Sequence, residues 1–168
     1  EIGVLNEGIS GNRLLVDGAG PIAEDLFERD VLDQPGVRWV GFSDDPINDL
    51  GSTRPAPSAA ALIAAIERLI EKAHAQHIRF FCSTLTSYEG GINTRREGEA
   101  AGSSTHSCAK AGVAAMALAT GTRRRMIPPN HHVFFPTYDS GDHLHPSDAG
   151  HKAIGNTLDL SLVFPNAE

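Results

Sequence analysis

The residues of this chain best placed to do chemistry are Asp142 and His145, in the stretch Asp-His-Leu-His at residues 142–145. They follow a turn-forming cluster at residues 138–141 and precede a helix-like segment. An aspartate at this spacing can accept the Nδ1 proton of the imidazole, which leaves Nε2 free as a general base. The same spacing fits a turn capped by Asp142, with His145 simply preceding Pro146, and alone it favours this plainer interpretation.

Two further stretches could help such a base to act on a carbonyl group. Asn48, beside Asp49, follows a strand-like run, and its amide could point into a crevice and stabilise an oxyanion. An ordinary turn is the usual meaning of such a pair. Gly11 lies in Gly-Ile-Ser-Gly-Asn-Arg, after a strand-like run at residues 2–5, where a glycine lets its backbone N–H approach a ligand closely. Alone, this stretch favours a plain connection between a strand and a helix.

In this order along the chain, the three stretches resemble sequence blocks of the SGNH (GDSL-type) hydrolases. Residues 6–13 match the family's glycine block, residues 46–49 its Gly-x-Asn-Asp block, and residues 142–145 its Asp-x-x-His block. The resemblance covers residues 1–88 and 138–162. It implies a single hydrolase domain over residues 1–168, N-terminally incomplete, with a divergent segment at residues 92–136.

The resemblance also implies a set of roles. Gly11 N–H and Asn48 Nδ2 would donate to the oxyanion, and His145 would be the general base, oriented by Asp142. Such an array suits acyl transfer, in which a carbonyl is attacked and its charge is captured on oxygen. The expected partner is a small-molecule ester, and the reaction would need no cofactor or metal.

The chain departs from the family pattern at its nucleophile. The Gly-Asp-Ser block is absent from the sequence, and Ser10 does not replace it, because the serine of the family's glycine block does not attack. We expect the nucleophile upstream of Glu1, since the chain has no initiator Met and opens within a strand-like run. The compartment cannot be read for the same reason. The chain from Glu1 alone would then hydrolyse esters weakly or not at all, and an inactive relic or binding module of the same fold is the alternative.

Two other departures from the family pattern concern the Gly-x-Asn-Asp block and the segment before the Asp-x-x-His block. Pro46 replaces the usual Gly of Gly-x-Asn-Asp, and because proline fixes φ and removes an N–H, it could displace Asn48. Residues 103–136 align with neither the helix nor the strand that the family has there, and within them residues 111–119 fit a buried strand or a small-residue helix. We hypothesise a pair of compensating reading-frame shifts, or an imperfectly read sequence. Peptide mass spectrometry across residues 96–137 would test it, and peptides matching the sequence would make the divergence genuine.

The elements that must position these residues alternate between strands and helices. Strands are predicted at residues 37–42 and 78–85, and a helix at residues 58–77 with Ser58 as its cap. The apolar stripe of that helix is Leu62, Ile63, Ile66, Leu69, Ile70 and Ala73. Helices of this length between strands imply parallel pairing, hence an α/β fold: a three-layer α/β/α sandwich with a flavodoxin-like sheet.

Two more helices are predicted at the ends of the chain. Ile22, Ala23, Leu26, Phe27 and Val31 fall at helical spacing, with Pro21 placed for the first turn. Residues 146–162 form the last helix, with an inner face of Ala149, Ala153, Ile154, Leu158 and Leu162.

The composition excludes several classes of function. A net charge of −7 and a pI of about 5.6 argue against a nucleic-acid partner, which needs a positive surface. No stretch approaches the roughly 20 apolar residues that span a bilayer. Cys82 and Cys108 cannot make a disulfide framework, and Cys82, in an apolar run, is predicted to be a small core residue.

Two rival sites remain. Residues 18–23, Gly-Ala-Gly-Pro-Ile-Ala, fit a dinucleotide-binding fingerprint, although Pro21 deletes an N–H near the pyrophosphate position and residues 14–17 are short for a first strand. Stabilisation by NAD would support that reading. The second rival is a metal site, which His-x-His spacing permits. Its ligands would be His131, His132, Asp142, His143 and His145.

Overall fold

The computed structural model describes residues 3–43, 46–83, 115–116, 134–156 and 160–162 of the chain. In chain order the elements are helix α1 (Ala23–Phe27), a π-helical turn (Glu28–Leu32), strand β1 (Trp39–Phe42), helix α2 (Pro46–Ser52), helix α3 (Ala59–Ala75), strand β2 (Arg79–Ser83), strand β3 (Ala115–Met116), helix α6 (Asp148–Gly155) and a 3-10 turn (Leu160–Leu162).

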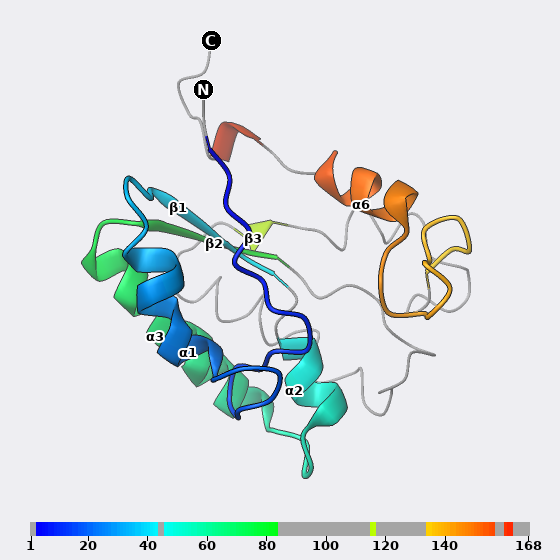
Figure 1. Cartoon of the computed structure of the whole chain (residues 1–168), viewed down its shortest axis with the longest axis horizontal. Coiled ribbons are helices and arrows are strands. Elements are labelled where there is room, and N and C mark those ends of the chain that lie inside the picture. Colours follow the sequence, from blue (N-terminus) through cyan, green and yellow to red (C-terminus); the bar gives the residue numbers. More distant parts are fainter. Residues whose placement is uncertain (1–2, 44–45, 84–114, 117–133, 157–159, 163–168) are drawn as a thin grey trace.

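The strands form a parallel sheet in the order β1-β2-β3 (Figure 1). Val40 lies opposite Phe80, and Cys82 lies opposite Ala115. The pairing confirms the predicted α/β class and both predicted strands, of which the structure describes the second as far as Ser83. The described part of the ambiguous segment 111–119 is a strand.

Helix α3 forms as the sequence predicts. The Ser58 side chain accepts the N–H of Ala61 at 3.2 Å, which satisfies one of the donors left open at a helix start. Leu62, Ile66 and Leu69 are fully buried. Burial stabilises the fold by about 1.5–3 kcal/mol for each such side chain. The stripe therefore fixes which side of α3 faces the sheet.

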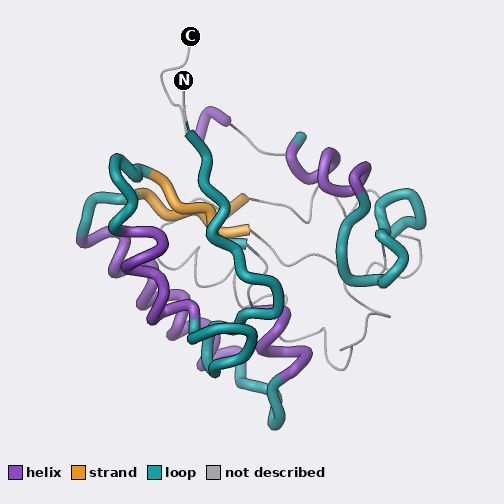
Figure 2. The backbone as a smooth tube through the Cα atoms, in the orientation of Figure 1, coloured by secondary structure: helices purple, strands orange, loops and turns teal. Residues whose placement is uncertain are grey.

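Helix α1 lies beside α3 against one face of the sheet (Figure 2). The predicted helix is confirmed, although its N-cap is Ile22 and Pro21 lies before it, outside the first turn. Phe80 of β2 anchors the layer, with its ring centroid 6.2 Å from Phe27 and 5.9 Å from Phe42. Helices α1 and α3 thus form a helical layer on one face of the parallel sheet.

The N-terminal strand-like run does not form a strand. Residues 3–9 are irregular, and Val4 and Leu5 are 89% and 67% exposed. Within the described residues this run pairs with no strand, and a strand depends on a neighbour for both its hydrogen bonds and its packing. The prediction that the glycine turn follows a strand is therefore wrong for this structure.

The last helix is shorter than predicted. Helix α6 ends at Gly155, with its N-cap at Ser147, and residues 160–162 form a separate 3-10 turn. Ala153 is buried on its inner face as predicted, but Ala149 is exposed. The helix packs instead through Gly150, which lies against the preceding loop.

Cys82 is fully buried in the core, as predicted, and is also disulfide-bonded. No helix among the described residues is long and apolar enough to cross a membrane. His131, His132 and Leu158 lie outside the described residues, as do residues 92–114 and 117–133 of the divergent segment.

Candidate active site

The loop before α6 is closed by its own backbone. Asp139 and Pro146 form an antiparallel bridge, and the N–H of Ser140 donates to the carbonyl of His145 at 3.0 Å. Below the bridge, Ser147 N–H donates to Tyr138 O at 2.8 Å, and the Ser147 hydroxyl accepts from Gly150 N at 3.2 Å. The start of α6 therefore holds the base of the loop.

Asp142 and His145 form a pair within this loop. Nδ1 of His145 lies 2.5 Å from Oδ2 of Asp142, and the backbone N–H of His145 donates to Oδ1 of the same carboxylate at 2.8 Å. Because an ionised carboxylate only accepts, the Nδ1 position of His145 carries the proton and Nε2 keeps its lone pair. This is the geometry expected for a histidine base oriented by an aspartate.

The electrostatics favour an ionised Asp142. The hydrogen bond from His145, together with the backbone N–H groups of His145 and Leu144, holds the pKa of Asp142 well below its usual range. The imidazole is two-thirds exposed, at 66%. An exposed ring with a fixed Nδ1 partner can pass a proton to and from a bound substrate.

Gly11 lies in the tight turn that its sequence block predicts. Asn12 N–H donates to Ile9 O at 3.0 Å, and Gly11 has φ +76°, the left-handed region that a glycine adopts without strain. Its own N–H donates to no acceptor among the described residues, and Gly11 is exposed. The turn thus presents an unused backbone donor.

Asn48 lies in the first turn of α2. Pro46, expected to disturb it, is the first residue of that helix, where a missing N–H costs nothing and the fixed φ suits the helix. The side chain of Asn48 is partly buried and makes no hydrogen bond to another described residue. Its amide remains available for a ligand.

Asp49 joins α2 to the chain that follows the glycine turn. Its carboxylate is fully buried and accepts the N–H groups of Leu14 at 2.7 Å and Leu15 at 2.9 Å. Burial raises the pKa of Asp49, against the opposing effect of these two N–H groups and the charge of Arg13. This link sets the position of Asn48 relative to the glycine block.

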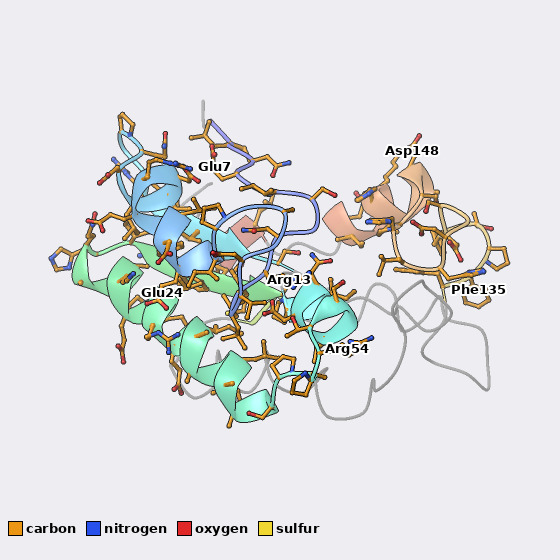
Figure 3. All side chains as sticks on the ribbon, turned by 60° about the horizontal axis from the view of Figure 1, so that its bottom comes forward. Glu7, Arg13, Glu24, Arg54, Phe135 and Asp148 are labelled. Carbon is orange, nitrogen blue, oxygen red and sulfur yellow. The ribbon has the colours of Figure 1, made fainter. Side chains whose placement is uncertain are left out.

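The predicted site residues thus fall into two preassembled groups. Asp142 and His145 form one, and the stretches carrying Gly11 and Asn48 form the other through Asp49. Strands β1 and β2 point towards the side where α2 and the loop near Phe135 lie, with α2 between that loop and the α1–α3 pair (Figures 1 and 3). Convergence of the two groups on one crevice stays a prediction.

The rival sites gain little from the structure. Residues 14–17 form no strand, and Gly18 N–H turns back to donate to Gly20 O at 2.9 Å, so this turn lacks the strand that a dinucleotide fingerprint follows. In the part of the chain that the structure describes, no three His, Cys, Asp or Glu side chains are grouped to hold a metal ion. His131 and His132 of the metal hypothesis lie outside that part.

Two aspartates have contacts that the sequence motifs do not predict. The sequence places Asp49 in a turn and in the Gly-x-Asn-Asp block but predicts no partner for it, because Leu14 and Leu15 are more than thirty positions away, beyond any local signal. Asp139 pairs with His143, and here a signal existed, because an aspartate four residues before a histidine can reach it in a turn.

Solved structures share this fold. No family profile matches the sequence, and no curated protein does. An α/β hydrolase from the metagenome of Lake Arreo is 17% identical, with a TM-score of 0.68, covering 98% of this chain and 73% of that one. An acetylxylan esterase from Geobacillus stearothermophilus, in a catalytic mutant, is 20% identical with a TM-score of 0.64, covering 95% and 71% respectively. A GDSL-like lipase from Bacteroides thetaiotaomicron is 15% identical with a TM-score of 0.62, covering 83% and 68%. The chain therefore has the α/β fold of the GDSL-type hydrolases, as its sequence blocks led us to expect.

Proposed function

We propose that the protein containing this chain, which has the fold of the GDSL-type hydrolases, hydrolyses small carboxylic esters by acyl transfer. The observation that carries the proposal is the contact between His145 Nδ1 and Asp142 Oδ2 at 2.5 Å, on an exposed loop directly before α6. A base fixed in this way serves nucleophilic catalysis, because it takes a proton from the attacking hydroxyl and returns it to the leaving group.

The nucleophile of the proposed mechanism is a serine that precedes Glu1. Its Oγ attacks the ester carbonyl while its proton moves to His145 Nε2, and the oxyanion accepts hydrogen bonds from Gly11 N–H and Asn48 Nδ2. Collapse of this intermediate breaks the bond to the alcohol, which takes the proton from His145. Water then attacks the acyl-serine by the same route, releasing the acid and restoring the serine.

Two observations support the oxyanion roles. The N–H of Gly11 and the amide of Asn48 are both without a hydrogen-bond partner among the described residues, whereas the neighbouring Asp49 is fully engaged in holding their chain segments. Donors that are fixed in place but unused need no rearrangement when charge develops on the substrate oxygen.

Acetyl esters are the first substrates to test. Four of the similar structures are acetylxylan or acetyl-xylooligosaccharide esterases, and a small acyl group makes few demands on the shape of the pocket. The p-nitrophenyl acetate and butyrate pair compares a short acyl chain with a longer one.

The test compares the chain from Glu1 with a protein that also carries the preceding residues. We expect the longer protein to hydrolyse p-nitrophenyl acetate and its His145→Ala variant to lose that activity. The chain from Glu1 should retain only the effect of the oxyanion donors and His145, about 10³–10⁴-fold over water. Strong turnover by that chain independent of His145 would contradict the mechanism.

A fluorophosphonate probe locates the nucleophile directly. It reacts with an activated serine, and peptide mass spectrometry of the labelled longer protein identifies the residue. We expect the labelled serine to lie before Glu1, and we expect no label in the His145→Ala variant. A folded longer protein without any labelled serine would favour a binding protein that has lost the chemistry.

A further inference from the structure

A second aspartate–histidine pair lies in the same loop as the first. Nδ1 of His143 is 2.5 Å from Oδ2 of Asp139, the same contact that joins His145 to Asp142. The Asp139 side chain is 6% exposed, whereas the imidazole of His143 is 53% exposed. One buried carboxylate thus holds a surface histidine two residues from the proposed base.

The two carboxylates together organise the backbone of the loop. Oδ1 of Asp139 accepts the N–H groups of Gly141 at 2.8 Å and His143 at 3.0 Å. Oδ1 of Asp142 accepts the N–H groups of Leu144 at 2.9 Å and His145 at 2.8 Å. The two turns overlap along the chain, because the hydrogen bonds of Asp139 reach residue 143 whereas the second turn already begins at Asp142.

His143 is the residue at which the loop reverses. Its φ is +59°, in the left-handed region that residues with a Cβ rarely adopt. It stands between Asp142 and His145, so its conformation decides whether those two side chains face each other. The bonds from its ring and its N–H to Asp139 hold it there.

We propose that Asp139 and His143 are positioning residues that hold the Asp142–His145 pair in its working geometry and fix the tautomer of His145. Their value for catalysis rests on the proposed function, whereas the effect on the loop does not. The burial of Asp139 supports this role. Burial opposes its ionisation, yet the N–H groups of Gly141 and His143 and the His143 imidazole outweigh it, and the pKa of Asp139 is lowered.

A purely electrostatic influence of Asp139 predicts the opposite result to a positioning role. Replacing Asp139 with asparagine removes a negative charge near Asp142, which by charge alone would lower the pKa of Asp142 further. Loss of positioning would instead separate Asp142 from His145, and the pKa of Asp142 would rise towards its ordinary value. The direction of the change therefore distinguishes the two.

The experiment uses NMR on the whole chain. Carboxyl ¹³C shifts report the pKa of Asp142, and the ¹⁵N shifts of the neutral imidazole ring report the tautomer of His145. In Asp139→Asn and His143→Ala we expect the pKa of Asp142 to rise and the Nδ1–H signal of His145 to give way to the Nε2–H form. His143→Asn should preserve both, since asparagine adopts left-handed backbone and its amide can donate to Asp139.

His77 supplies a matched control. It is also an exposed histidine with a left-handed φ, +58°, but it lies at the end of α3, so His77→Ala should leave both signals unchanged. An unchanged or lowered pKa of Asp142 in a folded Asp139→Asn protein would overturn the proposal. Should Asp139→Asn fail to fold, equal signals in His143→Ala and His143→Asn would overturn it.

Kinetics separate this inference from the proposed function. In the longer protein that carries the preceding residues, we expect Asp139→Asn to lower kcat by about 10²-fold with KM unchanged, because a displaced base acts on a normally bound substrate. If the Asp139 and His143 variants change the NMR signals as expected but the longer protein hydrolyses no ester, only the proposed function is contradicted. Normal kcat with unchanged signals would sink only the positioning role.

Discussion

The buried carboxylate of Asp49 accepts the backbone N–H of Leu14 at 2.7 Å, across 35 positions of sequence. It also accepts Leu15 N–H at 2.9 Å. One side chain thereby couples the helix that carries Asn48 to the chain leaving the turn of Gly11. Both proposed oxyanion donors depend on this contact for their relative position.

Asp49→Ala should therefore destabilise the protein. It leaves the N–H groups of Leu14 and Leu15 without acceptors, and each buried unsatisfied donor costs about 1–3 kcal/mol, so we expect about 2–6 kcal/mol in total. Urea unfolding of the whole chain measures the loss. Asp33→Ala, at an exposed aspartate, is the control and should change stability by less than about 0.5 kcal/mol. Equal effects at the two positions would contradict the assigned role of Asp49.

The stability contributed by Asp49 should also depend on pH. Because burial raises its pKa in the folded protein, the folded state binds more protons than the unfolded state in this range. Stability from this group is therefore greatest below the unfolded Asp value of about 3.9 and declines as the pH rises through the folded pKa. As the pH rises through this range, the free energy of unfolding of the native chain should fall relative to that of the Asp49→Asn variant. A difference that is flat or grows with pH would refute the raised pKa.

Gly150 is the point at which α6 touches the loop that carries Asp142 and His145. A Cβ at this position would stand 2.6 Å from Tyr138 O and 2.8 Å from Pro146 Cβ, closer than such atoms approach. Gly150→Ala should push the loop away from the helix and cost about 1–3 kcal/mol, as overpacking does. Gly155→Ala, in the same helix with nothing within 4 Å, is the matched control and should not destabilise. Thermal unfolding of both variants tests the contact.

Much of the fold can be predicted from the sequence because its signals are local. Ser58 and the stripe containing Leu62 and Ile66 specify the start and the buried side of α3 without reference to the rest of the chain. The Asp142–His145 contact is likewise local, because the two residues are three positions apart in one turn. Such features need no knowledge of tertiary structure.

The predictions that fail, or that the sequence does not offer, depend on contacts with residues that are distant in the sequence or on a neighbouring strand. The run containing Val4 and Leu5 has the composition of a strand, but composition cannot supply the neighbour that a strand requires. The role of Asp49 depends on Leu14, which no spacing rule connects to it. Ala149 fits a helical stripe, yet α6 approaches the loop through Gly150, a position that apolar periodicity does not mark.

His77 tests the cost of a left-handed residue away from the site. It follows the cap of α3, where its N–H donates to His74 O and Ile78 N–H donates to Ala73 O, both at 3.0 Å, a helix end usually made by glycine. The left-handed backbone costs about 1–2 kcal/mol, and glycine loses about 0.5–1 kcal/mol of chain entropy, so His77→Gly should stabilise by about 0.5–1 kcal/mol. Gln76 has φ −101°, so Gln76→Gly relieves no left-handed strain and should destabilise the protein instead. Denaturant midpoints distinguish the two signs.

Asn48 gives the most direct kinetic test of the oxyanion site. In the longer protein that carries the preceding residues, Asn48→Ala removes a donor whose bond forms only as charge develops on the substrate oxygen. We therefore expect kcat to fall by about 10²–10³-fold with little change in KM. Asn48→Asp is the sharper variant, because it keeps the shape of the side chain but replaces the donor with an anion that repels the developing charge, and its kcat should be lower still. Unfolding curves must match those of the native protein, so that the loss is not one of folding. A raised KM with normal kcat would place Asn48 in substrate binding and leave Gly11 as the remaining candidate donor.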